Sequence, residues 1–165
     1  MPSVASTATL DGGSPAHRAF VDRVDVGFAR PGGLVEQHRR VREPTALEWR
    51  HVRAGRALAR AADEAGKRVA LIASADHGHA HDADGPYGFH PAAAEYDRQV
   101  TELVQENRLA GLLELDPAFV DAAKADSWWQ MLMLHGALAD DWDAEFLSYE
   151  ASTYFGMLCA AYAPN

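Results

Sequence analysis

The stretch RVALIASADHGHAHDADGPYGFHP, residues 68–91, contains the most informative pattern of this chain. It starts with a short apolar run, Val69 to Ala73, that is typical of a strand covered on both faces in a parallel sheet. The run leads directly into a polar segment with four histidines and three aspartates. Ligands of open α/β sheets bind at the carboxyl ends of the strands, so we expect a functional site directly after residue 74.

Length and composition indicate one globular domain. The chain has 165 residues, of which 48% are hydrophobic and 24% are charged, ordinary values for a domain that buries a sizeable core. Cys159 is the single cysteine, which excludes an internal disulfide framework and favours a reducing compartment. No signal peptide and no apolar window of the roughly 18 residues that a membrane span needs are found. The sequence therefore predicts a soluble, cytoplasmic protein that does not bind a membrane.

Charge is distributed unevenly along the chain. Residues 1–68 carry 12 Lys and Arg against 8 Asp and Glu, whereas residues 69–165 carry 3 against 16, and the net charge is −9. A chain this acidic repels phosphate backbones. We therefore expect no nucleic-acid partner, and we interpret the basic run HRRVR at 38–42 as a solvated face.

The chain divides at residue 45. Glycines and prolines interrupt every periodic pattern in residues 1–45, which predicts an irregular N-terminal segment. In residues 46–165 we expect an α/β domain. Thr45 and Glu48 form a capping box at the start of a helix over 46–65, which Gly66 ends. The apolar face expected for this helix consists of Leu47, His51, Ala54, Leu58, Ala61 and Ala65.

Helix and strand signals alternate along the rest of the chain. A strand is expected at 68–74, a helix from Pro91 to residue 106, and a short helix after Asp116. Another helix is expected after Asp126 or Ser127, and one or two strands within 147–163. This order predicts an α/β fold with a central, mostly parallel sheet and helices on both faces, in three layers.

The histidines after the expected strand are candidate ligands or proton carriers. His77, His79 and His81 alternate, so an extended backbone would project them to one side, with neighbouring rings roughly 7 Å apart. Adjacent imidazoles could then share one metal ion. Histidines in polar loops are most often solvated, but three at period two after a strand favour a functional role.

Two neighbouring features keep two interpretations each. Tyr87 lies in the turn Gly85-Pro86-Tyr87-Gly88-Phe89, which would suit a pocket for a flat aromatic ligand but is equally an ordinary turn anchored by its aromatic residues. Asp126 is either the N-cap of the helix that follows it or a metal carboxylate.

Several blocks, in order, resemble the class III extradiol ring-cleavage dioxygenases. They are SADHGHAHDADGPYGFHP at 74–91, AAAEYD at 92–97, LLELDP at 112–117, AKADSWWQMLMLHGAL at 123–138 and YEASTYFGMLCAAY at 149–162. They are similar to the C-terminal half of the family that includes the protocatechuate 4,5-dioxygenase catalytic subunit. The resemblance implies a shortened form of the family fold. It also implies cleavage of a catechol-type aromatic ring beside its hydroxyls, with O₂ and non-haem Fe(II).

The resemblance also implies roles for single residues. The family's Ser-Gly-x-x-Ser-His motif corresponds to Ser74 through His79, which makes His79 the acid/base histidine, with His77 as a second catalytic candidate. An imidazole suits this role because it can accept a proton from a catechol and return it near neutral pH. The chain departs from the motif at Ala75 and Gly78, which replace Gly and Ser.

Candidate ligand-binding residues complete the expected site. Tyr87 and His81 are the candidates for contact with the substrate. The family holds iron with two histidines from its N-terminal half and one carboxylate, a facial triad with open positions. Asp126 and His17 are the candidate iron ligands in this chain, with His38 as the other candidate histidine.

Two other classes of function remain open at this point. The family also includes non-catalytic relatives of the Memo type, so a binding or assembly module is one alternative. A hydrolase that uses His77, His79 and His81 to hold a water-activating metal is the other. Loss of the family's N-terminal half would leave a sheet edge or an apolar face exposed, which favours a homo-oligomer.

Overall fold

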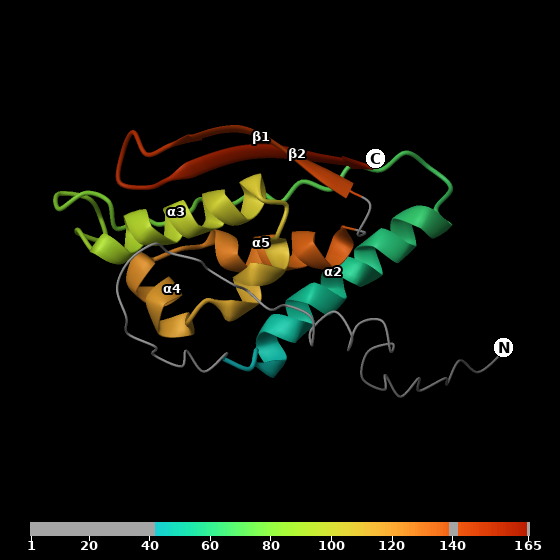
Figure 1. The fold of residues 1–165 in the computed structure, drawn as a ribbon, viewed down its shortest axis with the longest axis horizontal. Coiled ribbons are helices and arrows are strands. Elements are labelled where there is room, and N and C mark those ends of the chain that lie inside the picture. Colours follow the sequence, from blue (N-terminus) through green and yellow to red (C-terminus); the bar gives the residue numbers. More distant parts are fainter. Residues whose placement is uncertain (1–41, 139–141, 165) are drawn as a thin grey trace, which may run out of the picture. The chain divides into compact units, whose positions relative to one another are not determined.

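The computed structural model describes residues 42–138 and 142–164, and Figure 1 shows their arrangement. The elements are α2 (Ala46–Glu64), α3 (Pro91–Gln105), the 3₁₀-helix η1 (Leu109–Glu114), α4 (Pro117–Ala123), α5 (Ser127–Ala137), β1 (Trp142–Glu150) and β2 (Met157–Pro164). The predicted irregular segment lies outside the described residues except for 42–45. No helix within the described ranges has both the length and the apolar composition of a membrane span.

Helix α2 begins and ends as the sequence predicts. The capping box at Thr45 is present, and Glu48 accepts a hydrogen bond from the Thr45 backbone N–H. Gly66, with φ of 60°, follows the last turn, in the left-handed conformation that glycine adopts without strain.

A partly buried ion pair ties the start of α2 to η1. Arg42 pairs with the buried Glu48 carboxylate at 2.7 Å and also donates to the carbonyl oxygens of Leu113 and Leu115. These bonds offset the cost of burying the Glu48 charge. They fix the entry of the chain into the domain.

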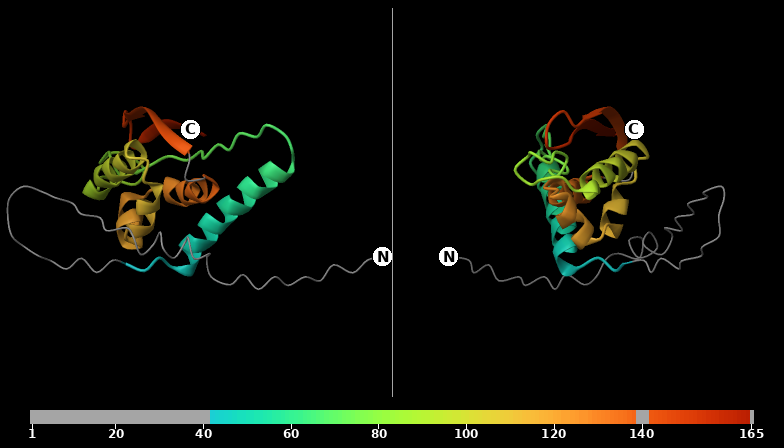
Figure 2. Two further views of the ribbon diagram at one scale, coloured as in Figure 1. Left: turned by 45° about the vertical axis from the view of Figure 1, so that its right-hand side comes forward. Right: turned by 90° about the vertical axis from the view of Figure 1, so that its left-hand side faces the viewer.

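Helices α2 and α5 cross with very close backbones. A β-carbon on Gly55 would lie 1.9 Å from the carbonyl oxygen of Met133, and one on Gly136 would lie 2.0 Å from that of Val52. Only glycine fits at either position. Figures 1 and 2 show the resulting crossing of the two helices.

The crossing selects a different face of α2 from the predicted one. The buried positions are Glu48, Val52 and Gly55, whereas Leu47 and Leu58 are 47% and 50% exposed. The predicted apolar face is therefore wrong by about one residue around the helix. The cause is packing, because the close approach at Gly55 outweighs the extra apolar area that the predicted face offered.

The core lies between the helices. Its fully buried side chains include Val52, Tyr96, Val100, Val104, Leu112, Trp128 and Leu132. Trp128 satisfies its indole N–H by donating to the carbonyl oxygen of Leu112 at 2.9 Å. Helix α3 packs against α4, η1 and β1, so the core connects the helices to one face of the hairpin.

The strands form an antiparallel hairpin. Trp142 pairs with Pro164 and Glu150 with Met157, and the register shifts between Phe146 and Ser148. This confirms the prediction of one or two strands near 147–163. The hairpin lies on one side of the helices (Figure 2).

The structure thus mixes helices and strands, as expected of an α/β chain, but its described residues contain no central parallel sheet. The strand predicted at 68–74 is wrong: these residues form no strand, and Val69, Leu71 and Ile72 are 59%, 46% and 82% exposed. A strand needs a hydrogen-bonded neighbour. Within the described ranges the hairpin strands pair only with each other, so the run has no neighbour.

Candidate functional site

Residues 76–81, called the histidine segment below, run beside the turn that joins β1 to β2. The N–H of His77 donates to the carbonyl oxygen of Gly156 at 2.9 Å. The N–H of Gly156 donates to the carbonyl oxygen of Gly78 at 3.1 Å. The backbone N–H of His81 donates to the carbonyl oxygen of Tyr154 at 3.2 Å. These bonds hold the segment antiparallel to residues 154–156.

The opposite side of the histidine segment is bonded to the junction of α4 and α5. The N–H of His79 donates to the carbonyl oxygen of Ala123 at 2.9 Å, and the carbonyl of Asp76 accepts the N–H of Ser127 at 3.0 Å. In a regular strand the N–H groups of residues 77, 79 and 81 would all point to one neighbour. Here the middle one donates to a different neighbour, so the segment does not form a regular strand, and the three imidazoles bond to different groups.

His77 lies in the core. It is 3% exposed, and its Nδ1 is 2.5 Å from the Oγ of Ser127, which is itself 2.9 Å from the hydroxyl of Tyr96. Burial lowers the pKa of His77 and raises that of the Tyr96 hydroxyl. The buried Asp97 and the nearby Asp76 oppose the shift of His77 but do not overcome it. His77 is therefore held neutral in a buried chain of hydrogen bonds.

His79 has a fixed tautomer. Its Nδ1 lies 2.7 Å from the carbonyl oxygen of Lys124. A carbonyl only accepts hydrogen bonds, so Nδ1 carries a proton and the neutral ring keeps its lone pair on Nε2. Nε2 lies 3.4 Å from the Asp76 carboxylate, which is half exposed. Lys124 ends α4 in the left-handed conformation, with φ of 54°.

Aromatic rings surround the His79 imidazole. Tyr87 approaches it edge-on, with ring centroids 5.5 Å apart, and Tyr154 and Phe155 lie 6.0 and 5.8 Å away. Tyr154 belongs to the same turn that holds the histidine segment. The ring of His79 thus has a polar side at Asp76 and an apolar wall.

His81 pairs with a carboxylate that the sequence analysis did not single out. Its Nε2 lies 2.8 Å from Oδ2 of Asp97, and the Tyr149 hydroxyl donates to the same oxygen at 2.6 Å. Asp97 is fully buried on α3. One signal was present in the sequence, because Asp97 falls on the apolar stripe of its helix between Tyr96 and Val100.

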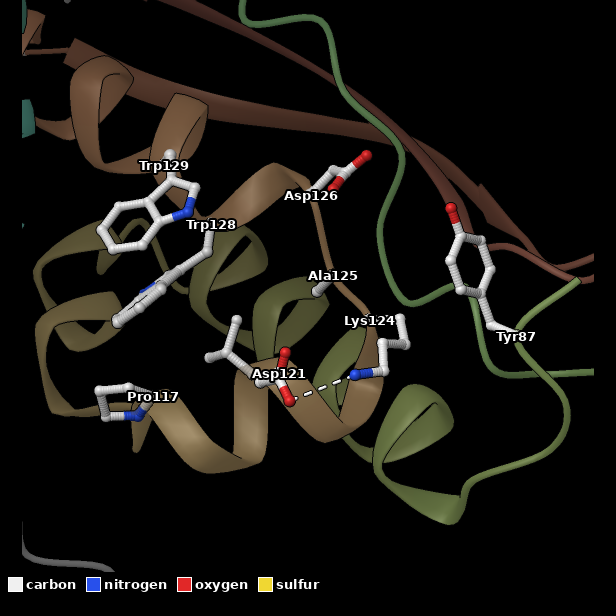
Figure 3. Close-up of a pocket in the computed structure, with 9 residues that line it drawn as sticks. Tyr87, Pro117, Asp121, Lys124, Ala125, Asp126, Trp128 and Trp129 are labelled. Atoms are coloured by element: carbon white, nitrogen blue, oxygen red, sulfur yellow. Dashed lines mark hydrogen bonds and ion pairs between the residues drawn. The ribbon is translucent and has the colours of Figure 1, made fainter.

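A cavity of about 280 Å³ lies beside the histidine segment. Its lining consists of Tyr87, Pro117, Val120, Asp121, Lys124, Ala125, Asp126, Trp128 and Trp129. Figure 3 shows the two tryptophans on one side and Tyr87 on the other, with Lys124 paired to Asp121 at 3.2 Å. A dry cavity of roughly 150 Å³ accepts benzene, so this volume suffices for a single aromatic ring.

The predicted site residues are only partly brought together. Tyr87 both lines the cavity and touches the His79 ring. Asp126 also lines the cavity, is exposed, and makes no side-chain cap bond at the start of α5. His77 and His81 are bonded to partners elsewhere, and His17 lies outside the described residues.

The histidines do not form the shared metal site that their spacing suggested. Within residues 42–138 and 142–164, no group of three or more His, Cys, Asp and Glu side chains could hold a metal ion. Each imidazole has its own hydrogen-bond partner instead. The described residues therefore do not supply the triad that Fe(II) requires.

Comparison with known proteins identifies the family. The sequence model of one protein family, the catalytic LigB subunit of aromatic ring-opening dioxygenase, matches residues 40–160, well over half of the chain. The chain therefore belongs to this family, which confirms the resemblance found in the sequence. The enzymes of this family act on aromatic substrates with O₂ and generally depend on non-haem iron.

One curated relative matches a part of the chain. Protein CA_C1420 of Clostridium acetobutylicum is 29% identical over 101 residues, which are 61% of this chain and 22% of that protein. The matched region thus spans about a fifth of the relative's length. The name of that protein states no activity.

Proposed function

We propose that this chain takes part in extradiol cleavage of a catechol-type aromatic ring with O₂, and that His79 is its acid/base residue. One observation carries the proposal: the bond from Nδ1 to the Lys124 carbonyl leaves the Nε2 of the neutral ring able to accept a proton. The Asp76 carboxylate at 3.4 Å would stabilise the imidazolium that results. A catechol must lose a hydroxyl proton before its ring is attacked, so a base with this orientation suits the reaction.

The aromatic substrate would enter beside Tyr87. The cavity is walled by Tyr87, Trp128 and Trp129, and such faces favour a flat ring through offset or edge-on contacts. Tyr87 also touches His79, so a ring in contact with Tyr87 would lie next to the base. His81 is proposed as a second polar contact for the substrate.

We propose Fe(II) as the cofactor, in keeping with the family. Iron would supply the redox chemistry with O₂. Asp126 and His17 are the proposed ligands, and Asp126 has the exposed carboxylate at the cavity that this role needs. Because the described residues form no triad, only the proton chemistry of His79 is assigned to particular atoms.

Oxygen uptake tests the proposal. The purified chain, supplied with ferrous iron under anaerobic conditions and then mixed with catechol or protocatechuate in aerated buffer, is expected to consume O₂ and form a yellow ring-opened product. H79N is expected to lower the rate by about 10²-fold or more, the usual contribution of an acid/base residue.

The matched control is H90N, which makes the same substitution at the exposed N-cap of α3, where asparagine is also a good cap. It should retain the wild-type rate. Unchanged uptake in H79N would remove His79 from the mechanism. No uptake by the wild-type chain would leave the second candidate function.

That second candidate is a non-catalytic binding or assembly module of the Memo type, and it agrees with the separate hydrogen-bond partners of His77, His79 and His81. Such a module would bind a catechol without turnover, so calorimetry would show binding while O₂ stays constant. The hydrolase alternative needs His77, His79 and His81 on one metal, and their separate partners argue against it.

We also propose that the chain self-associates through the exposed apolar run of residues 69–72. Antiparallel pairing of two copies about Ile72 would place Arg68 of one copy opposite Asp76 of the other, an attractive cross-strand pair. The pairing would also supply the strand neighbour that the run lacks among the described residues. A cytoplasmic location stays a prediction.

A further inference from the structure

Asp97 is the most densely bonded side chain of the site. It lies on α3 with a fully buried carboxylate. Its Oδ1 accepts the N–H of Gly78 at 2.7 Å, and its Oδ2 accepts from His81 Nε2 at 2.8 Å and from the Tyr149 hydroxyl at 2.6 Å. Hydrogen bonds to an ionised carboxylate are among the strongest in proteins. Three of them converge here from two other parts of the chain.

The surroundings are shaped to admit this carboxylate. A β-carbon on Gly156 would lie 1.9 Å from Oδ2 of Asp97, and one on Gly78 would lie 2.8 Å from the Cα of Ala93. Both positions therefore require glycine. The close approach lets Gly156 and Gly78 bond to each other through their backbones, which brings the turn, the histidine segment and α3 together around Asp97.

We propose that Asp97 is a positioning residue for the histidine segment. Its bond to the Gly78 N–H fixes the peptide group between residues 77 and 78, directly before His79. It thereby holds His79 in place against Lys124 and Tyr87. Its bond to His81 fixes the proton of the neutral ring on Nε2. Asp97 acts through the two histidines and contacts neither cavity nor substrate.

The fixed tautomer gives His81 a defined chemistry. With Nε2–H bonded to Asp97, the lone pair of the neutral ring is on Nδ1. His79 has the opposite arrangement, with Nδ1–H bonded to the Lys124 carbonyl and the lone pair on Nε2. The structure thus presents two imidazoles with different nitrogens free to accept a proton, and the substrate contact proposed for His81 would be made through Nδ1. This part rests on the proposed function.

Nitrogen NMR of the histidine side chains tests the positioning role without any turnover. In the wild-type chain, ¹⁵N shifts of neutral His81 should report a proton on Nε2, and those of neutral His79 a proton on Nδ1. D97N keeps the size of the side chain but presents an amide that has one acceptor oxygen for three donors. It should change the His81 tautomer ratio and speed exchange of the Gly78 amide proton by about tenfold or more, because local opening becomes easier.

The matched control is Y149F. It removes the third donor and leaves the bonds of Asp97 to Gly78 and His81 in place, so the His81 tautomer should stay as in the wild type. An unchanged His81 tautomer and unchanged Gly78 exchange in D97N would overturn the proposal. So would a wild-type spectrum with the His81 proton on Nδ1, a result that needs no variant to fold.

Oxygen uptake adds a readout that separates positioning from a merely structural role. If Asp97 positions the proton carriers, D97N should shift the pH profile of kcat/KM, while Y149F should keep the wild-type profile. A lowered melting temperature with an unshifted profile would overturn the role. If the wild-type chain consumes no O₂, the proposed function fails, and the tautomer measurement still decides whether Asp97 positions the histidines.

Discussion

Two consecutive regions of the chain contrast sharply. Residues 69–72 are apolar and are exposed on the described domain, whereas the histidine segment at 76–81 is polar and largely buried. Hydropathy alone predicts the reverse. The difference is one of partners: the histidine segment has backbone bonds to residues 154–156 and to the α4–α5 junction, and the apolar run has no strand beside it among the described residues.

The contrast shows that burial follows the hydrogen-bond partners of the backbone as well as the side chains. A buried N–H without a partner costs about as much free energy as a lost hydrogen bond. The backbone N–H groups of His77, His79 and His81 in the histidine segment have partners within the domain. The apolar run lacks such partners among the described residues, and its large side chains forgo part of the roughly 1.5–3 kcal/mol that full burial of each would contribute.

The strongest way to break the contrast is to displace the histidine segment from its partners. G156A places a β-carbon 1.9 Å from the Asp97 carboxylate and should lower the free energy of unfolding by roughly 3 kcal/mol, because it overpacks a buried, charged cluster. Urea denaturation followed by circular dichroism measures the loss.

G88A is the control for this substitution. Gly88 has φ of 68° with nothing within 4 Å of an added β-carbon, so only backbone strain of about 1 kcal/mol is expected. Equal losses in the two variants would show that the contact between Gly156 and Asp97 does not stabilise the fold.

Acid should weaken the histidine segment selectively. Burial lowers the pKa of His77 in the folded state below its ordinary 6.5, so as pH falls from 6.5 the unfolded chain binds this proton before the folded chain does. Stability from this group is complete above pH 6.5 and declines toward the folded-state pKa. The melting temperature should therefore fall between pH 7.5 and pH 5.

H77N tests whether this decline belongs to His77. Asparagine can still bond to Ser127 but does not titrate, so the variant should show a shallower dependence of melting temperature on pH than the wild type. Parallel curves for the two proteins would assign the acid sensitivity to other groups.

The apolar run should be the least sensitive region. I72K changes a side chain that is 82% exposed, so the free energy of unfolding should stay within about 0.5 kcal/mol of the wild type. The mass measured by light scattering after gel filtration should fall from a dimer to a monomer. A monomeric wild-type chain would contradict the proposed self-association, and a large loss of stability in I72K would show that the run is packed in solution.

Local signals predicted most of the elements. The capping box at Thr45, the glycine at 66 and the prolines at 91 and 117 set helix ends through local bonds and backbone angles. The tail rich in aromatic and small apolar residues predicted one or two strands within 147–163, and the structure has two there. These features depend on neighbours within a few residues, so the sequence contains the necessary information.

The site was less predictable, for reasons visible at single residues. Period-two spacing placed His77, His79 and His81 on one side, but the N–H of His79 donates to a different neighbour from the other two, so the segment does not form a regular strand. Asp97 stood out little in the sequence, and its role depends on Gly78 and Tyr149, 19 and 52 residues away. Spacing along the chain cannot report such contacts.

The sequence by itself determined the family, the helix ends and the presence of strands near 147–163, because these follow from residue order and short-range bonds. Only the tertiary structure decided which face of α2 is buried, which of residues 69–81 are covered, and which nitrogen of each histidine is free. Those outcomes depend on close approaches between distant segments, at Gly55 with Met133 and at Gly156 with Asp97. Such approaches arise only when all the elements pack together.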